Sequence, residues 1–213
     1  MTAPEAAPGT ETPRARVMRW RKAERERLIA ARMAMDAAER RGLAAAIAKR
    51  LDAALGDIAG RIVSTYWPFR GEPDLRPWME AVAVRGGRCA LPIVVEKGAP
   101  LIFRTWRHGE TLARGVWNIP IPEAGVEVTP DVVISPVVGF DRDAFRLGYG
   151  GGFFDRTLAG LAAKGFRPLV VGVGYGLAEI PTIHPLPHDI PMSGIVTERE
   201  TVWPERTAAP AGG

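Results

Sequence analysis

Residues 146–155 read Arg-Leu-Gly-Tyr-Gly-Gly-Gly-Phe-Phe-Asp, a glycine-rich stretch between a predicted strand and a predicted helix. Four of the five residues 148–152 are glycine. Glycine lets backbone N–H groups approach an anion, because no side chain keeps the ligand away. Residues 132–135 before the loop favour a buried strand, and residues 153–164 after it favour a helix. The order of strand, glycine loop and helix N-terminus predicts a phosphate-binding site.

The charged residues that flank the loop also suit an anion. Arg146 can supply a bidentate guanidinium. Asp155, near the helix start, can offer an oxygen to a magnesium ion that bridges the same phosphates. The loop lacks the lysine-serine or lysine-threonine pair of a Walker A motif, and no later acidic residue is clearly spaced for a dinucleotide ribose. A tight structural turn therefore stays as the alternative to an anion site.

The composition favours one globular domain that binds a small anion. The chain has 213 residues, 46% of them hydrophobic, which is enough for a substantial core. The net charge of +4 is mildly basic. The arginines are interleaved with Glu24, Glu26 and Glu39, as on solvated helix faces, so we expect no nucleic-acid partner. A basic nucleic-acid-binding protein is the least favoured alternative.

The single cysteine, Cys89, cannot form an internal disulfide and is expected to be a buried thiol on a strand, in a reducing compartment. No apolar run approaches the length of about 18 residues needed to span a membrane. The first residues have no hydrophobic signal region and include Glu5 and Glu11, which argues against a transit peptide. We therefore expect a cytoplasmic protein with no membrane partner.

Helices are expected over residues 17–35 and from Asp36, as N-cap, to about residue 55, and these two form an opening hairpin. A third helix is expected over residues 75–84 with Asp74 as its cap. Strands are expected at residues 61–66, 88–95, 101–106, 132–135, 168–175 and 195–197, the third of them antiparallel to a neighbour.

Strands that alternate with helices imply a single three-layer α/β/α domain with a mostly parallel central sheet. Residues 117–122 hold too much proline for a central strand. We place the domain at residues 16–203. A disordered tail is expected at 1–15 and a flexible tail at 204–213, because neither stretch can bury enough apolar surface to offset the cost of ordering.

The glycine segment also carries a resemblance to a known family. Residues 146–156 resemble the hallmark segment of the 5-formyltetrahydrofolate cyclo-ligases, also called 5,10-methenyltetrahydrofolate synthetases. The resemblance runs from about residue 21 to residue 198. It includes, in the family's order, Tyr-Trp-Pro at 66–68, Glu72, Trp-Asn-Ile-Pro at 117–120, Pro136, Phe-Asp at 140–141 and His-Asp at 188–189. The fold that it implies is NagB/RpiA/CoA-transferase-like.

The resemblance implies an ATP- and Mg²⁺-dependent ring closure. The γ-phosphate of ATP activates the formyl oxygen of 5-formyltetrahydrofolate, N10 attacks the activated carbon, and phosphate leaves to give 5,10-methenyltetrahydrofolate. Positioning and charge neutralisation are the main tasks of the protein in such a reaction. The implied partner is a small-molecule folate, and the implied state is a monomer.

The resemblance also implies a nucleotide site. Its residues would be Lys22, Arg25, Arg146, Leu147, Gly148, Tyr149, Gly150, Gly151, Gly152, Phe153 and Phe154. Of these, Arg146 and Phe154 would act in catalysis. Arg21 is a rival for the N-terminal pair, and a solvated helix face is the alternative for all three N-terminal residues.

The folate and metal sites are implied in the same way. The folate site would consist of Trp67, Glu72, Trp117, Tyr149, Gly150, Gly151, Gly152 and Phe153, and the magnesium ligands would be Asp155 and Asp189. A carboxylate at Glu72 can accept paired hydrogen bonds from a pterin, whereas a polar turn residue is the alternative. Core tryptophans are the alternative for Trp67 and Trp117.

The sequence departs from the family pattern at two places. Phe153 and Phe154 replace a pair of tyrosines, and Ser193 stands where the family usually has an aspartate. These departures keep open a diverged paralogue that binds nucleotide but acts on another substrate or regulates. The three histidines, 108, 184 and 188, form no metal-binding pattern and are expected to be structural or surface residues.

Overall fold

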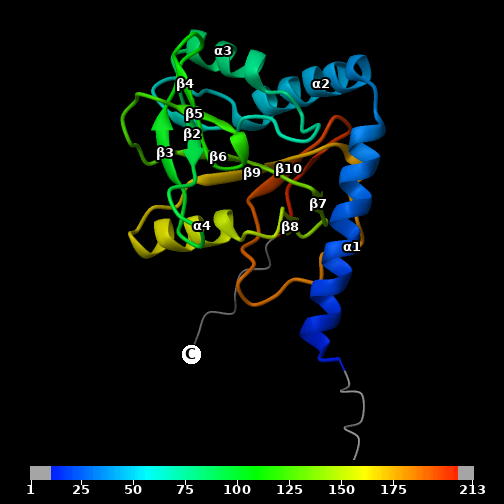
Figure 1. The fold of residues 1–213 in the computed structure, drawn as a ribbon. Coiled ribbons are helices and arrows are strands. Elements are labelled where there is room, and N and C mark those ends of the chain that lie inside the picture. Colours follow the sequence, from blue (N-terminus) through cyan, green and yellow to red (C-terminus); the bar gives the residue numbers. More distant parts are fainter. Residues whose placement is uncertain (1–10, 206–213) are drawn as a thin grey trace, which may run out of the picture.

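The computed structural model describes residues 11–205, and strands alternate with helices along them (Figure 1). The helices are α1 (Pro13–Ala34), α2 (Ala37–Leu55), α3 (Arg76–Val84) and α4 (Phe153–Ala163), with short 3₁₀ turns η1 (Val116–Asn118) and η2 (Gly176–Ala178). The strands are β1 (Ile62–Ser64), β2 (Arg88–Ile93), β3 (Ile102–Thr105), β4 (Leu112–Arg114), β5 (Pro120–Pro122), β6 (Val132–Pro136), β7 (Gly139–Phe140), β8 (Arg146–Leu147), β9 (Leu169–Val173), β10 (Gly194–Val196) and β11 (Thr201–Val202).

The central sheet has seven strands in the order β11-β10-β9-β6-β1-β2-β3. The five inner strands are parallel, and the edge strands β11 and β3 are antiparallel to their neighbours. The mostly parallel sheet is therefore confirmed, as is the antiparallel pairing of the third predicted strand. The carboxyl ends of the inner strands meet at one edge, which is where open α/β sheets bind ligands.

Alternating side chains of the inner strands pack into two separate cores. Val132 and Ile134 of β6 belong to the core that α2 and α3 cover, whereas Val133 belongs to the core under α4. Leu158 is the buried contribution of α4 to this second core. Helices thus cover both faces, and the three-layer arrangement is confirmed (Figure 1).

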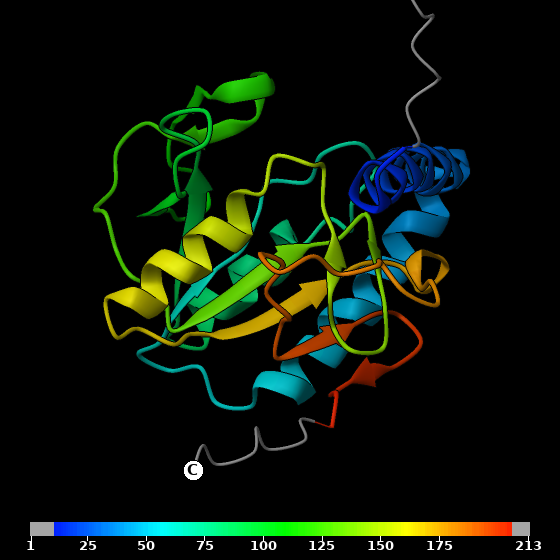
Figure 2. The same ribbon diagram turned by 90° about the horizontal axis from the view of Figure 1, so that it is seen from below.

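Helix α1 lies outside these layers, along the edge where the strands end. Its buried Leu28 packs with Val138, Leu147 and Ile183 in a third core. Figure 1 shows α1 running crosswise to α2, and Figure 2 shows it nearly end-on beside the sheet. The predicted helical hairpin is therefore wrong, because α1 packs against distant segments of the chain instead of folding back on α2.

A side-chain cap starts two of the first three helices, α1 and α2, but not α3. Asp36 caps α2 by accepting the Glu39 N–H at 2.8 Å, as predicted. Helix α1 begins at Pro13, earlier than predicted, because Thr12 accepts the Ala15 N–H. The predicted Asp74 cap is wrong. Helix α3 begins one residue later, behind Leu75, and the Asp74 carboxylate accepts the N–H and side chain of Arg76 in a local turn.

Three pairings of short strands were not predicted. Strands β4 and β5 form a two-stranded ribbon, which agrees with the exclusion of residues 117–122 from the central sheet. Strands β7 and β8 form a hairpin between β6 and the glycine loop, and β11 extends the sheet edge. Of the tails predicted at residues 1–15 and 204–213, residues 1–10 and 206–213 lie outside the described residues. Residues 13–15 are the first of helix α1, so the predicted disorder is wrong there. No helix within residues 11–205 is long and apolar enough to cross a membrane.

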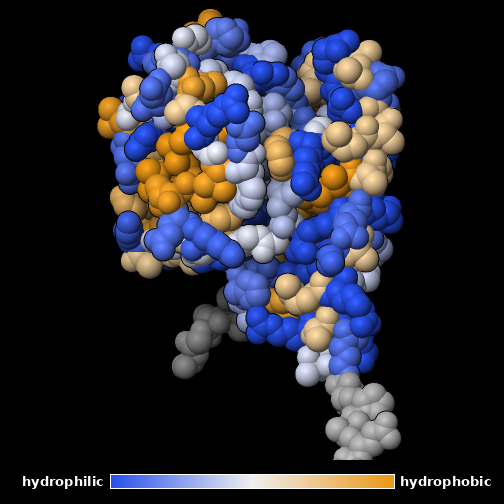
Figure 3. Space-filling view, viewed as in Figure 1, coloured by the Kyte–Doolittle hydropathy of each residue, from blue (hydrophilic) through white to orange (hydrophobic). Residues whose placement is uncertain are grey.

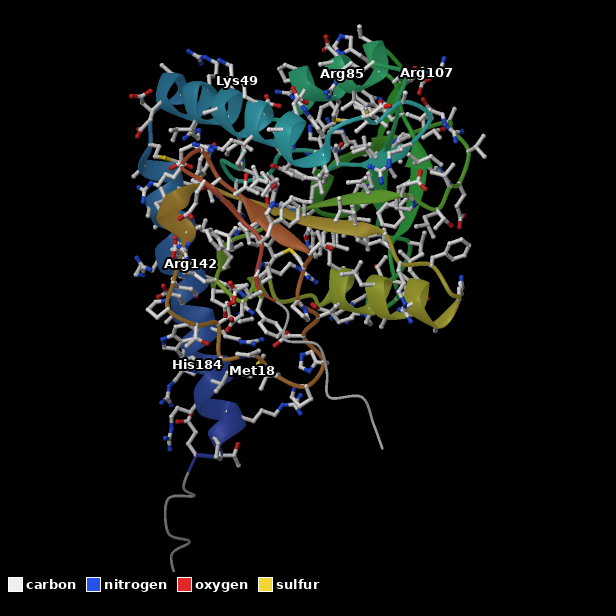
Figure 4. All side chains as sticks on the ribbon, turned by 180° about the vertical axis from the view of Figure 1, so that it is seen from behind. Met18, Lys49, Arg85, Arg107, Arg142 and His184 are labelled. Carbon is white, nitrogen blue, oxygen red and sulfur yellow. The ribbon has the colours of Figure 1, made fainter. Side chains whose placement is uncertain are left out.

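The packing of α2 makes a direct prediction about stability. Leu51 is fully buried against the sheet, so Leu51→Ala should lower the free energy of unfolding by about 2–5 kcal/mol through lost burial and a cavity. Lys49 points outward from the same helix (Figure 4). Lys49→Ala should therefore change the free energy of unfolding by less than about 0.5 kcal/mol. Urea denaturation measures both, and equal effects would contradict the assigned packing.

Candidate functional site

A cleft of about 420 Å³ opens where the inner strands end. Its walls are α1, the turn 66–72 after β1, the segment 116–121 of the β4–β5 ribbon, and residues 146–155. On this face, Figure 3 shows mostly hydrophilic residues along α1 and an apolar patch over β2 and β3. The cleft therefore has a charged wall and an apolar wall, which suits a ligand with an anionic part and a flat apolar part.

The glycine loop forms the floor of the cleft beside α4. Gly150 and Gly152 adopt φ angles of 94° and 63°, which side chains disfavour. Gly152 occupies the N-cap position of α4 and provides no side-chain cap, so the first N–H groups of the helix stay available to an anion. The predicted order of glycine loop and helix start is confirmed, although the β7–β8 hairpin separates the loop from β6.

Arg146 lies beneath the loop and is only 7% exposed. Its Nη1 donates to the Ile190 carbonyl at 3.3 Å, and its guanidinium lies 5.5 Å from the centre of the Phe154 ring. Its Nη2 is 2.8 Å from Asp155 Oδ1 but lacks the alignment of a hydrogen bond. The Arg146 guanidinium is therefore buried beside the glycine loop and paired with Asp155.

The N-terminal cations divide between the cleft and the solvent. Arg21 and Arg25 line the cleft, and Arg25 Nε donates to the Gly148 carbonyl at 2.6 Å. Lys22 is exposed and does not line the cleft, so the geometry favours the rival Arg21 over Lys22 as the partner of Arg25. Positions 21 and 25 are one helical turn apart on the same face, whereas position 22 points about 100° away from position 21.

The two predicted magnesium ligands lie in the cleft, and each is already paired with an arginine. Asp189 accepts hydrogen bonds from Arg21 at 2.5 and 3.3 Å and from the Leu186 N–H at 2.6 Å. Burial would raise the pKa of Asp189, but these hydrogen bonds outweigh it, so its pKa lies below the ordinary value. Asp155 accepts the Ile190 N–H at 3.1 Å and pairs with Arg146.

The described residues hold no group of three or more His, Cys, Asp and Glu side chains suited to a metal. Two carboxylates alone are a weak cage for magnesium. They do fit the usual arrangement in which Mg²⁺ takes one or two carboxylates and completes its shell with substrate phosphates and water. The donors present therefore fit magnesium as a companion of a nucleotide.

At the other end of the cleft, Glu72 is buried and 5% exposed. Its Oε2 accepts the Phe69 N–H at 2.9 Å, and its Oε1 accepts the Tyr149 hydroxyl at 2.9 Å. Burial raises the pKa of Glu72 to about 7, against the opposing effect of the nearby Arg32. The alternative of a polar turn residue stays open, because Glu72 also closes the turn 69–72 through its N–H and its carboxylate.

The aromatic residues form the flat parts of the cleft. Trp67 is partly buried and meets Trp106 edge to face at 5.7 Å between ring centres. Trp117 is 59% exposed and meets Phe153 edge to face at 5.8 Å. A core role is therefore wrong for Trp117, whose backbone adopts a φ of 55° at the tip of the β4–β5 ribbon.

Some cleft residues were not identified from the sequence. Met18 lines the cleft three residues before Arg21, and this helical spacing with Arg25 was a usable signal. Phe69, Arg70 and Val116 also line it, but nothing in their local sequence marks them. Ser193 does not line the cleft. Its hydroxyl accepts the Val170 N–H at 3.1 Å, which makes it part of the sheet edge.

The histidines behave largely as expected. His108 lies in an exposed turn and pairs with Glu80, and His184 meets the ring of Trp20 edge to face. His188 lies at the cleft, 3.8 Å from Asp189, with its side chain mostly exposed. The predicted buried strand position of Cys89 is confirmed, and burial raises the pKa of its thiol to about 12.

Comparison with known sequences gives a consistent result. The model of the 5-formyltetrahydrofolate cyclo-ligase family matches residues 17–198. A 5-formyltetrahydrofolate cyclo-ligase of Mycolicibacterium smegmatis is 33% identical over 153 residues, which cover 68% of this chain and 77% of that protein. The protein of the same name from Escherichia coli K12 is 32% identical over 152 residues, covering 68% and 82%.

Solved structures share the fold. A 5,10-methenyltetrahydrofolate synthetase of Aquifex aeolicus superposes with a TM-score of 0.74 at 24% identity, covering 90% of this chain and 96% of that one. The corresponding Mycoplasma pneumoniae protein gives a TM-score of 0.68 at 22% identity, covering 84% and 98%. At these identities the structural likeness establishes the fold.

The burial of Glu72 predicts a pH-dependent effect on stability. The unfolded carboxyl titrates near pH 4.5 and the folded one near 7, so between these values the folded state holds more protons and stability falls as the pH rises. Glu72→Gln removes that loss. The melting temperature of the variant relative to wild type should therefore increase by about 5 °C or more between pH 5 and pH 8. Thermal denaturation across this range measures it, and a constant difference would contradict the assigned burial.

Proposed function

The chain belongs to the 5-formyltetrahydrofolate cyclo-ligase family, and from this premise we propose how its cleft converts 5-formyltetrahydrofolate to 5,10-methenyltetrahydrofolate. The reaction consumes ATP and releases ADP and phosphate. In the proposal, the triphosphate lies over the glycine loop and α4, and the pterin lies against Glu72.

One hydrogen bond carries the proposal. The Tyr149 hydroxyl donates to Glu72 at 2.9 Å, so a residue of the phosphate cradle also contacts the group proposed to hold the pterin. The two ligand ends are therefore neighbours in one cleft. That adjacency suits a reaction in which the γ-phosphate must reach a formyl group on the pterin ring, since reacting atoms need to be about 3–3.5 Å apart.

In the first step the formyl oxygen attacks the γ-phosphorus, and the bond from phosphorus to the bridging oxygen of ADP breaks. Negative charge on the transferring group would be stabilised by the guanidinium charge of Arg146, by the first N–H groups of α4 and by Arg25. Phe154 has no hydroxyl and would act by supporting the guanidinium of Arg146 from one side.

In the second step N10 attacks the activated formyl carbon, N10 loses its proton, and phosphate leaves with the electrons of the carbon–oxygen bond. The ring closure is intramolecular, so the protein needs mainly to hold the folate folded and exclude water from the activated group. Trp67, Trp117 and Phe153 supply the flat apolar surfaces that suit this task.

We further propose that Asp155 and Asp189 hold Mg²⁺ together with ATP. When bound, the ion would neutralise phosphate charge near Arg146.

The buried thiol of Cys89, the sole cysteine, supports a reducing compartment and thus a cytoplasmic enzyme.

The role of Arg146 predicts a large loss of turnover in Arg146→Lys. A lysine lacks the guanidinium fork, so kcat/KM should fall by about 100-fold or more, measured as methenyl product absorbance in the presence of protein, ATP and folate. Arg142 lies in the turn of the same hairpin, is exposed and pairs with Glu179 and Glu200 (Figure 4), and Arg142→Lys should stay within about twofold of wild type.

Two outcomes would argue against this account. Equal turnover in both variants would contradict the role of Arg146. Retained ATP binding with no product from wild-type protein at high concentration would favour a diverged paralogue with another substrate, as the Phe153–Phe154 pair allows.

The pairing of both carboxylates with arginines predicts that magnesium binding depends on the nucleotide. Without ATP, Mg²⁺ should bind only weakly, because Arg21 and Arg146 already neutralise Asp189 and Asp155. With a non-hydrolysable ATP analogue present, calorimetry should show Mg²⁺ affinity at least about tenfold higher, and Asp155→Asn should reduce that gain. Tight binding of Mg²⁺ alone would refute the proposed arrangement.

A further inference from the structure

Arg32 is a buried cation that the proposed reaction does not use. It lies on α1, is 4% exposed and forms no ion pair with a carboxylate among the described residues. Its Nε donates to the Arg70 carbonyl at 2.9 Å, its Nη1 to the Val137 carbonyl at 3.4 Å, and its Nη2 to the Tyr149 hydroxyl at 2.7 Å. A buried charge needs such partners, since an unpaired one is costly.

The hydrogen bond from Arg32 to Tyr149 begins a short relay, by which we mean the chain of hydrogen bonds from Arg32 through Tyr149 to Glu72. The Tyr149 hydroxyl accepts from Arg32, and its single proton has two acceptors within reach, Glu72 Oε1 at 2.9 Å and the Phe69 carbonyl at 3.4 Å, of which Glu72 is the nearer. The other carboxylate oxygen accepts the Phe69 N–H from the same turn that Arg32 holds through the Arg70 carbonyl. Arg32 therefore contacts Tyr149, which donates to the Glu72 carboxylate, and Arg70, which follows the second donor Phe69 in the chain.

The groups around Glu72 also show that Arg32 influences its ionisation. Three titratable or charged groups face it: Arg32 from α1, Tyr149 from the glycine loop and Tyr66 from the end of β1. Burial raises the pKa of Glu72 to about 7, and Arg32 is the leading effect that lowers it. Tyr66 is a neutral donor to the Pro73 carbonyl, so Arg32 is the cation of the group.

We propose that Arg32 is a positioning residue for the folate end of the cleft, which orients Tyr149 and the turn 69–72 and so directs the Glu72 carboxylate toward the pterin. The inference rests on the proposed function for the identity of the ligand. The arrangement of Arg32, Tyr149 and Glu72 is independent of that identity, so it can be tested without folate.

The test without folate follows the titration of Glu72 by carbon-13 NMR of its carboxyl group, assigned with Glu72→Gln. The wild-type midpoint is expected at about pH 7. Arg32→Met keeps an unbranched side chain and removes the charge, so the midpoint should move to higher pH. Arg27→Met is the matched control, because Arg27 is an exposed arginine of the same helix and should leave the midpoint unchanged. An unchanged midpoint in Arg32→Met would overturn the proposal.

A second measurement separates the relay from a general effect of charge. In Arg32→Met, Tyr149→Phe and the double variant, both single changes should weaken binding of 5-formyltetrahydrofolate by about tenfold at pH 7, while the ATP affinity of Arg32→Met stays within about twofold. If the hydroxyl transmits the effect of Arg32, the double variant should be little worse than either single variant. Fully additive losses would contradict the relay.

Two further outcomes are also decisive. If Arg32→Met does not fold, Arg32→Lys replaces it in both measurements. Lysine keeps the charge, so the Glu72 midpoint should stay near wild type while folate binding still weakens through the lost fork. Unchanged folate binding in that variant would overturn the proposal. If wild-type protein binds no folate, the proposed function fails, but the Glu72 titration still decides the role of Arg32.

Discussion

The site depends on one face of α1, because that face supplies the cations that hold together three other segments of the chain. An α-helix turns about 100° per residue, so positions 21, 25 and 32 fall within about 40° of one another. Arg21 holds the loop that carries Asp189, Arg25 holds the glycine loop at Gly148, and Arg32 holds the turn after β1. Each arginine satisfies carbonyl groups of loops that have no sheet partners of their own.

This arrangement separates the origin of stability from the origin of function. The two cores around the sheet involve α2, α3 and α4, whereas α1 adds only the small core around Leu28. The cleft lies between the rigid strand ends and the arginines of α1. It retains costly features there, namely the buried carboxylate of Glu72 and the unaligned Nη2 of Arg146. Such features are typical of ligand sites, because binding supplies the partners that folding leaves out.

The features that could be predicted from the sequence are those that depend on residues close together in the chain. The glycine loop, the start of α4 at Phe153, the Asp36 cap and the main strands follow from local residue types. The β7–β8 hairpin was missed because strands of two residues have no periodicity. The crossing of α1 and α2 depends on what Leu28 packs against, and the contact of Glu72 with Tyr149 joins residues 77 apart. The choice between Arg21 and Lys22 as the partner of Arg25 likewise required knowing which face of α1 lines the cleft.

The most direct test of this account is a crystal structure with a non-hydrolysable ATP analogue, Mg²⁺ and 5-formyltetrahydrofolate bound together. We expect the γ-phosphate at Arg146 and the first turn of α4, the pterin at Glu72, and the formyl oxygen within about 3.5 Å of the γ-phosphorus. Two ligands in separate cavities, or a pterin that does not contact Glu72, would contradict it.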